Sequence, residues 1–116
     1  MARQTHTPYT LLGSYPVVAA DAFEKAWVAA DATNFEEVAS TGREIVIAYN
    51  SGATARLVTI ESVADAHQRT GDLTETVAAG NVGIFGVMQL EGFRSAGMLN
   101  FRAAHADVKF IVLRLP

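Results

Sequence analysis

Residues 99–113, LNFRAAHADVKFIVL, decide the fold class of this chain. The first part of the stretch alternates apolar and polar side chains with a period of two, which is the pattern of a half-buried β-strand. From Val108 to Leu115 both alternating sets are largely apolar, which is typical of a strand that lies centrally or is covered on its second side. The stretch therefore predicts two strands, with Phe101, Phe110 and Val112 in the core of the domain.

The same signals recur upstream, where strand-forming runs from Gly42 onward are separated by turn residues. The further predicted strands are Arg43–Asn50, Ala55–Val63, Leu73–Ala78 and Val82–Met88. The first of them places Ile45, Ile47 and Tyr49 on one face, and the turn residues 50–52 predict a hairpin into the second. With about seven or eight strands at this spacing, we predict an all-β fold, an antiparallel β-sandwich of jelly-roll-like topology.

The segment Ala22–Ala30 fits two kinds of secondary structure. Phe23, Trp27 and Ala30 recur at helical spacing among strong helix formers, which favours a helix. Phe23, Lys25 and Trp27 also alternate along one face of a strand. We predict a strand, because a sandwich needs a partner for its edge, and the helix stays open as the alternative.

Residues 1–16 are polar, contain two prolines and follow neither hydrophobic period. We therefore predict an extended N-terminal arm ahead of a single domain at residues 17–116. The arm could lie across a neighbouring chain or add a strand to an exposed sheet edge, and the alternative is that it packs on its own domain as an ordinary first strand. Its candidate interface residues are Thr7, Pro8, Tyr9, Leu11, Leu12 and Tyr15.

Composition limits the classes of function. The 116 residues allow one domain, and 50% hydrophobic residues exclude a disordered chain. Only 18% of the residues are charged, below the roughly 25% of an average domain, which indicates a neutral surface or one covered by other chains. A net charge of −3 with nine scattered Lys and Arg argues against nucleic acid as a partner. The lack of cysteine excludes disulfides, and the lack of a long apolar run predicts no signal peptide or membrane span.

No motif for chemistry stands out, so we predict no catalytic residue, metal or cofactor. The histidines His6, His67 and His105 lie in separate segments without ligand spacing, and we interpret them as solvated loop residues. The acidic residues are interpreted as a solvated edge; they are Asp21, Glu24, Asp31, Glu36 and Glu37. Neither a nucleophile elbow nor a phosphate-binding glycine loop is present.

Three smaller features carry hypotheses. Gly83 and Gly86 lie inside an apolar strand, where they indicate a bulge or a close backbone approach, including one to a neighbouring subunit. Trp27 and Phe93 could form a sugar-binding platform or pack in the core. Around Thr70-Gly71, Arg69 and Asp72 could pair with each other as a loop brace or reach across an interface.

From about Phe23 to Pro116 the chain resembles a group of short virion proteins of tailed bacteriophages, encoded near the major capsid protein and thought to be β-sandwich head proteins. The residues that carry the resemblance are Trp27 with Ala30-Asp31, Thr41-Gly42-Arg43-Glu44, Asn50-Ser51-Gly52, Val58-Thr59-Ile60, Arg69-Thr70-Gly71-Asp72, Ala79-Gly80, Phe85-Gly86, Gly92-Phe93, Val108-Lys109-Phe110 and Leu113-Arg114-Leu115-Pro116. They are mostly turn and core positions, and the family pattern carries no catalytic residue.

The resemblance implies a structural role without chemistry. We expect a decoration or cement protein on the capsid surface, present in many copies, in contact with the major capsid protein and neighbouring virion subunits, and made in the host cytoplasm. A minor tail or head-completion protein is the alternative within the same class. A small carbohydrate-binding module for attachment to the host surface is the contrasting class; exposure of Trp27 or Phe93 in a groove would favour it.

Overall fold

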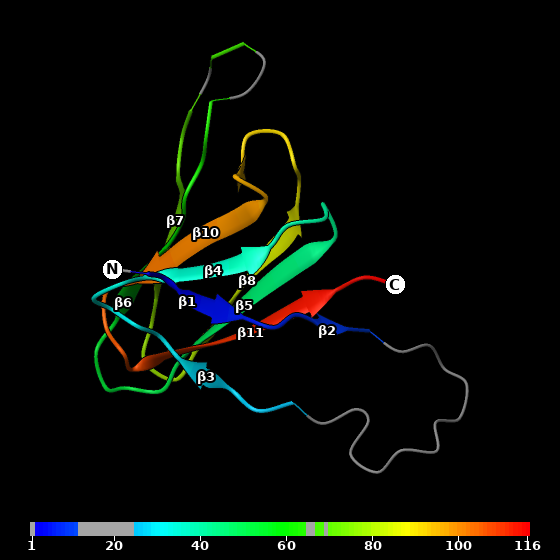
Figure 1. The fold of residues 1–116 in the computed structure, drawn as a ribbon. Helices are drawn as coiled ribbons and strands as arrows, with labels where there is room; N and C mark the ends of the chain where they lie inside the picture. The colour runs from blue at the N-terminus through cyan, green and yellow to red at the C-terminus, as the bar shows by residue number, and fades with distance from the viewer. Residues whose placement is uncertain (1, 12–24, 65–66, 69) are drawn as a thin grey trace, which may run out of the picture.

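The computed structural model describes residues 2–11, 25–64, 67–68 and 70–116. Within these residues the chain is all-β, with eleven strands and no helix, arranged as two sheets that pack against each other (Figure 1). The strands are β1 (Gln4–His6), β2 (Tyr9–Thr10), β3 (Val28–Ala29), β4 (Glu36–Ala39), β5 (Glu44–Asn50), β6 (Arg56–Ile60), β7 (Leu73–Val77), β8 (Val82–Met88), β9 (Arg94–Ser95), β10 (Met98–Ala103) and β11 (Val108–Arg114).

The two sheets have different strand orders, and both are mixed. Sheet A runs β1-β4-β10-β6-β7, with β9 paired to β10, and sheet B runs β2-β11-β5-β8, with β3 paired to β11. The pairs β1 with β4 and β2 with β11 are parallel, whereas the other pairs are antiparallel. The all-β prediction is therefore confirmed and the arrangement is sandwich-like, but the sheets are mixed rather than purely antiparallel because β1 and β2 pair in parallel. The number of strands exceeds the seven or eight expected because β1, β2, β3 and β9 have only two or three residues, too few for a readable alternation.

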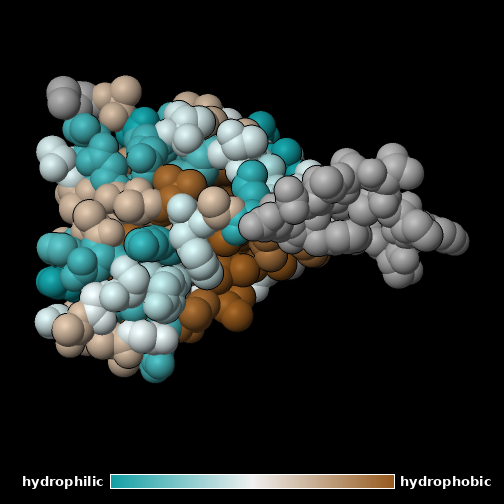
Figure 2. Space-filling model, turned by 90° about the horizontal axis from the view of Figure 1, so that it is seen from below, coloured by the Kyte–Doolittle hydropathy of each residue, from teal (hydrophilic) through white to brown (hydrophobic). Residues whose placement is uncertain are grey.

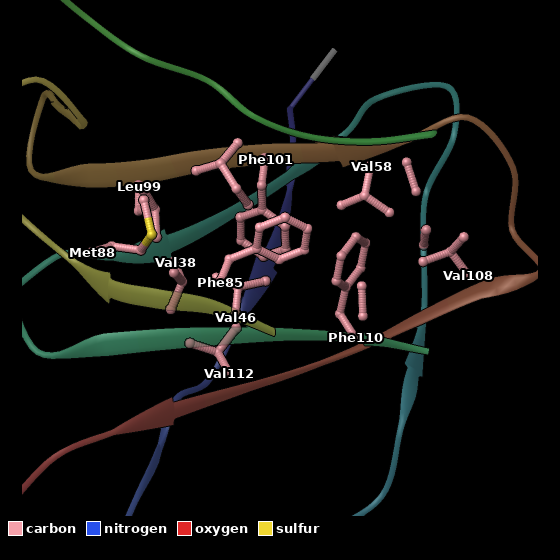
Figure 3. Packing of buried hydrophobic residues seen from close by; sticks show 14 of the residues in the cluster. Val38, Val46, Val58, Phe85, Met88, Leu99, Phe101, Val108, Phe110 and Val112 are labelled. Carbon is pink, nitrogen blue, oxygen red and sulfur yellow. The ribbon is translucent and has the colours of Figure 1, made fainter. Parts of the chain in front are cut away.

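The core lies between the sheets and is built from the alternate residues of the longer strands (Figure 3). Phe101 from β10 and Phe110 from β11 meet at its centre, with ring centroids 4.9 Å apart in an edge-to-face arrangement. Both are fully buried, and Val112 is 2% exposed, which confirms the three predicted core residues. The remaining buried apolar residues are Ala30, Val38, Val46, Ala48, Val58, Ile60, Val77, Phe85, Met88, Leu99, Ala103 and Val108.

The predicted hairpin between the runs beginning at Arg43 and Ala55 is wrong, because β5 and β6 belong to different sheets. The chain crosses between the sheets after Asn50, whose buried side chain organises the crossing. Its amide donates to the carbonyl oxygens of Thr54 at 2.7 Å and Val77 at 2.9 Å, and its Oδ1 accepts from the Gly52 amide at 3.0 Å. The turn residues at 50–52 thus join two layers rather than two neighbouring strands.

The short strands β1, β2 and β3 answer part of two questions that the sequence left open, the secondary structure of residues 22–30 and the packing of the N-terminal arm. Val28–Ala29 is extended and pairs with β11, and no helix occurs between Lys25 and Ala30; residues 22–24 lie outside the described residues. In the predicted arm, β1 and β2 pair with β4 and β11 of the same chain, as in the alternative that the arm forms an ordinary first strand. Residues 12–16 lie outside the described residues.

The glycines of β8 are explained within the chain. The register between β5 and β8 shifts between Glu44 and Val46, which is the internal bulge that the sequence left as one alternative. A Cβ on Gly86 would lie 2.9 Å from the Cα of Ile45, so only glycine fits there without a backbone shift.

Candidate functional site: an apolar sheet face

The ionisable side chains of the described residues fall mostly into structural roles. No three His, Cys, Asp or Glu side chains among these residues are arranged to hold a metal ion.

A helix able to span a membrane is also not found in the described part of the chain. His67 and His105 are exposed, as predicted. Of the acidic residues, Asp31 and Glu37 are only partly covered, whereas Asp21 and Glu24 lie outside the described residues.

His6 and Glu36 correct the prediction that both are solvated. His6 is 6% exposed and Glu36 is fully buried, with His6 Nε2 3.6 Å from Glu36 Oε1. The His6 ring packs against Phe101 and Phe110, at centroid distances of 5.2 and 6.0 Å. The parallel pairing of β1 with β4 turns both side chains inward, which fills one end of the core with polar groups.

One of the two carboxylate oxygens of Glu36 accepts hydrogen bonds from the chain itself. Its Oε1 accepts hydrogen bonds from Gln4 Nε2 at 2.7 Å and from the Asp31 amide at 2.8 Å. Its Oε2 and the His6 Nε2 have no hydrogen-bond partner in the structure. The pair therefore ties the N-terminal strand and the Asp31 turn to sheet A, which is a structural role.

Glu44 is a second buried carboxylate, at the start of β5. It accepts hydrogen bonds from the Thr41 amide and hydroxyl, both at 2.7 Å, from the Gly42 amide at 3.2 Å and from Arg114 Nε at 2.6 Å. Burial raises the pKa of this carboxyl, but the Thr41 and Arg114 interactions together outweigh it, so the pKa lies below its ordinary value. This cluster fastens the end of β11 to β5.

The candidate interface residues of the arm are only partly described. Tyr9 of β2 pairs with Leu113 of β11, and the Leu11 amide donates to the Arg114 carbonyl at 2.8 Å. Both residues therefore form backbone contacts within the chain. Thr7 is exposed and Pro8 is partly covered. Leu12, Tyr15 and Arg69 lie outside the described residues. The prediction that these residues form an interface therefore stays a prediction.

Asp72 braces its own loop. Its Oδ1 accepts hydrogen bonds from the Ser62 amide at 2.9 Å and from the Ser62 hydroxyl at 3.3 Å. The Gly71 amide donates to the same hydroxyl at 2.8 Å. Asp72 therefore holds its loop through Ser62, while the suggested pairing with Arg69 lies outside the described residues.

The two aromatic candidates for ligand stacking lie in different places. Trp27 is 39% exposed and packs on Tyr49 with ring centroids 5.5 Å apart, on the outer face of sheet B. Phe93 is partly buried against the core and lines an open groove together with Ser62, Val63, His67, Thr70, Gly71, Gln89, Glu91 and Gly92. The structure thus does not join the two rings into one platform.

The outer face of sheet B is the feature that the sequence analysis missed. The register of β5 with β11 and β8 places Ile47 beside Ile111 and Ile84, and puts Ile45 and Leu113 in the next row. These side chains point away from the core, because the buried residues of β5 are the alternate ones. Ile84 is 70% exposed and Val82, in the row of Tyr49, is 48% exposed. Figure 2 shows hydrophobic residues gathered on this side of the molecule.

Charge is nearly absent from this apolar face. Along β5, β11 and the first three residues of β8, the outward positions are Ile45, Ile47, Tyr49, Lys109, Ile111, Leu113, Val82 and Ile84, among which only Lys109 is charged. An antiparallel sheet with one solvated face normally carries polar residues there. Of these outward side chains Val82 and Ile84 are exposed and the others are half-buried, so the apolar face is most open along β8.

The outer face of sheet A differs in kind. Arg3 forms two hydrogen bonds to the Glu61 carboxylate, at 2.8 and 3.1 Å, and Arg102 lies 3.4 Å from the same group. Both guanidinium groups lie over the Phe35 ring, at 5.7 and 5.4 Å from its centroid. Sheet A thus presents a charged surface suited to water, and sheet B presents an apolar one.

Comparison of the chain with protein-family models, with curated proteins and with solved structures finds no match.

Proposed function

We propose that this protein is a structural component of a larger assembly, and that it works by burying the outer face of sheet B against neighbouring subunits. The supporting observation is the nearly uncharged row of isoleucine, leucine, valine and aromatic residues on that face, with Lys109 as its one charged member among the described outward positions. Burial of apolar surface contributes about 25 cal/mol per Å², so such a face favours association over solvation.

The specific form of this proposal is a capsid decoration or cement protein of a tailed bacteriophage. The resemblance of residues 23–116 to short virion proteins supports it, and so does the low content of charged residues, because charges are depleted at interface centres. The protein would bridge capsid subunits, so that separating them under internal pressure also breaks its contacts. A jelly-roll-like topology of the sandwich, as expected from the sequence, is part of this proposal.

The test is to locate the protein in the particle. Mass spectrometry should find it in purified virions of the phage that encodes it, and a map of the intact particle should show the sandwich outside the capsid shell. Absence from virions contradicts the proposal. Density at the neck or tail would replace decoration by the head-completion or minor tail function.

A matched pair of variants tests the face itself. Ile111→Lys places a charge in the centre of the sheet B face and should lower occupancy on capsids while the fold persists. Leu57→Lys makes the same change at a side chain that is 46% exposed on sheet A, and should leave occupancy unchanged. Wild-type protein should stay bound at ~1 M salt, where the Debye length is ~3 Å and exposed ion pairs are screened. Equal loss in both variants, or release by salt, contradicts an apolar interface on sheet B.

One observation favours a second function, binding of a carbohydrate. The exposed indole of Trp27 packs against Tyr49 with the rings tilted by 40°, and an exposed indole can accept the apolar face of a sugar ring. A glycan array and tryptophan fluorescence titrations would detect such binding. Saturable quenching by a glycan, lost in Trp27→Ala, would replace the structural proposal with attachment to a host surface.

A further inference from the structure

β8 is the last strand of sheet B, and its outer side is open. It pairs with β5 through the register Val82 with Tyr49 to Phe85 with Val46, and among the described residues no strand pairs with its other side. In an antiparallel pair only alternate residues bond to the neighbour, so the remaining amide and carbonyl groups of β8 face outward. Such an unpaired row is a template for a further strand.

Two of the devices that protect exposed edges, charged side chains and proline, are missing from β8. Its sequence, VGIFGVM, contains no charged residue and no proline. Two of its outward side chains, Val82 and Ile84, are 48% and 70% exposed. The bulge opposite Glu44 disturbs the far half of the strand, so the regular, pairing-competent part is Val82–Phe85.

β7, the edge strand of sheet A, carries a charge that β8 lacks, and this difference bears on which strand can pair with itself. β7 ends sheet A on the same side of the molecule, and the two edge strands line one open groove. β7 has Glu75 at its centre, so two copies of β7 paired antiparallel about that residue would oppose like charges, which is destabilising. β8 paired with its own copy opposes no charges at all. The distribution of charge therefore favours self-pairing through sheet B and disfavours it through sheet A.

We propose that two copies of this chain associate through antiparallel pairing of β8 with β8 about a two-fold axis. Each copy presents the same strand, which is the requirement for a closed two-fold interface. Because Val82 and Ile84 lie in the rows of Tyr49 and Ile47, pairing joins the two apolar faces into one continuous surface. This inference deepens the proposed function, since it doubles the surface offered to a neighbouring subunit, and it rests on that function only for the use of the joined surface.

Sedimentation equilibrium of the full chain should show a species of twice the 12.4 kDa chain mass. With the two-fold axis at Ile84, Ile84→Lys should weaken the dimer by more than about tenfold, because the substitution places two ammonium groups opposite each other. Leu57→Lys adds the same charge on the other sheet and should leave the dimer unchanged. A wild-type chain that stays monomeric, or a dimer insensitive to Ile84→Lys, overturns the proposal.

A cross-link gives a second measurement that does not depend on the lysine variant. The chain has no cysteine, so Ile84→Cys introduces a single thiol. Oxidation should link two Ile84→Cys chains quickly, whereas Leu57→Cys should link slowly or not at all. Equal rates for the two variants overturn the pairing. A monomer that is nevertheless found on virions overturns the pairing alone, and a β8-paired dimer that is absent from virions overturns only the proposed function.

Discussion

Replacing Glu44 by glutamine should destabilise the sandwich at neutral pH and have little effect in acid. The substitution preserves side-chain volume and removes the charge of a fully buried carboxylate. In the wild type that carboxylate accepts hydrogen bonds from Thr41, Gly42 and Arg114. Glutamine has one carbonyl oxygen for these donors, and its NH₂ group cannot accept from the guanidinium.

The magnitude follows from the hydrogen bonds that the substitution removes. A hydrogen bond to a charged group contributes ~1.5–3 kcal/mol, and removing one partner of a buried charged pair costs ~3–5 kcal/mol. Arg114 is 25% exposed and also donates to the Ala39 carbonyl, so it remains partly satisfied without Glu44. We expect a loss of about 2–4 kcal/mol in the free energy of unfolding, out of a total of ~5–15 kcal/mol. For a domain of this size that corresponds to a decrease in Tm of roughly 10–20 °C.

The pH dependence has a defined sign. The folded-state pKa of Glu44 lies below its ordinary value of 4.5, so its contribution to stability is present above that pH and is lost as the pH falls through the folded-state pKa. Urea unfolding of the wild type and of Glu44→Gln should therefore show a full difference at neutral pH and a shrinking one below pH 4.5. Other carboxyls titrate in both proteins, so their effects cancel in the difference.

Glu75→Gln is the matched control, because it removes the same charge from an exposed position in β7. It should leave the unfolding midpoint within experimental error of the wild type. If Glu44→Gln has the same midpoint as Glu75→Gln, or if its difference from the wild type persists unchanged in acid, the stabilising role of the buried carboxylate is refuted.

Three further predictions concern packing and the N-terminal strands. Phe110→Ala should lose ~3–5 kcal/mol and be poorly folded by circular dichroism, and a wild-type Tm would place that ring outside the core. Gly86→Ala should lower the Tm because its Cβ meets the backbone of Ile45 at 2.9 Å, whereas Gly71→Ala, which meets no atom within 4 Å, should not; equal Tm values would contradict the close approach. Removing residues 2–11 should lower the Tm, because it removes both parallel strands and the buried histidine; an unchanged Tm would support an independent arm instead.

The longer strands can be predicted because each carries a local signal, either a period-two pattern or a short apolar run bounded by turn residues. The sequence predicts Val82–Met88 with the bounds that β8 has, and the predicted Val108–Leu115 differs from β11 by one residue. Turn residues act locally in the same way, as at Ala96-Gly97 between β9 and β10, where the φ angles are 51° and 82°. Local chemistry decides such features, because alternation and turn residues act within a few positions of each other.

Strand partners cannot be predicted in the same way. The turn residues after Asn50 are compatible with a hairpin and with a crossing between sheets, and the choice depends on the carbonyl of Val77, 27 residues away. The burial of His6 depends equally on distant partners, since β1 has three residues and joins β4 in parallel. A polar stretch without a readable period contains no local sign of such pairing, which explains why the prediction of solvated His6 and Glu36 is wrong.

The choice of which face of β5 is buried also could not be predicted from the sequence, and it bears on the proposed function. From sequence alone, the face with Ile45, Ile47 and Tyr49 is the more hydrophobic one, and it would be chosen as the core face. The structure instead buries the other set, which includes Glu44 and Asn50, and satisfies both polar groups with hydrogen bonds. Among the described residues, a strand that buries its more polar side leaves its more apolar side, here half-buried, outside the core. Because exposed apolar surface is costly in water, this arrangement supports a final state in which another chain covers sheet B.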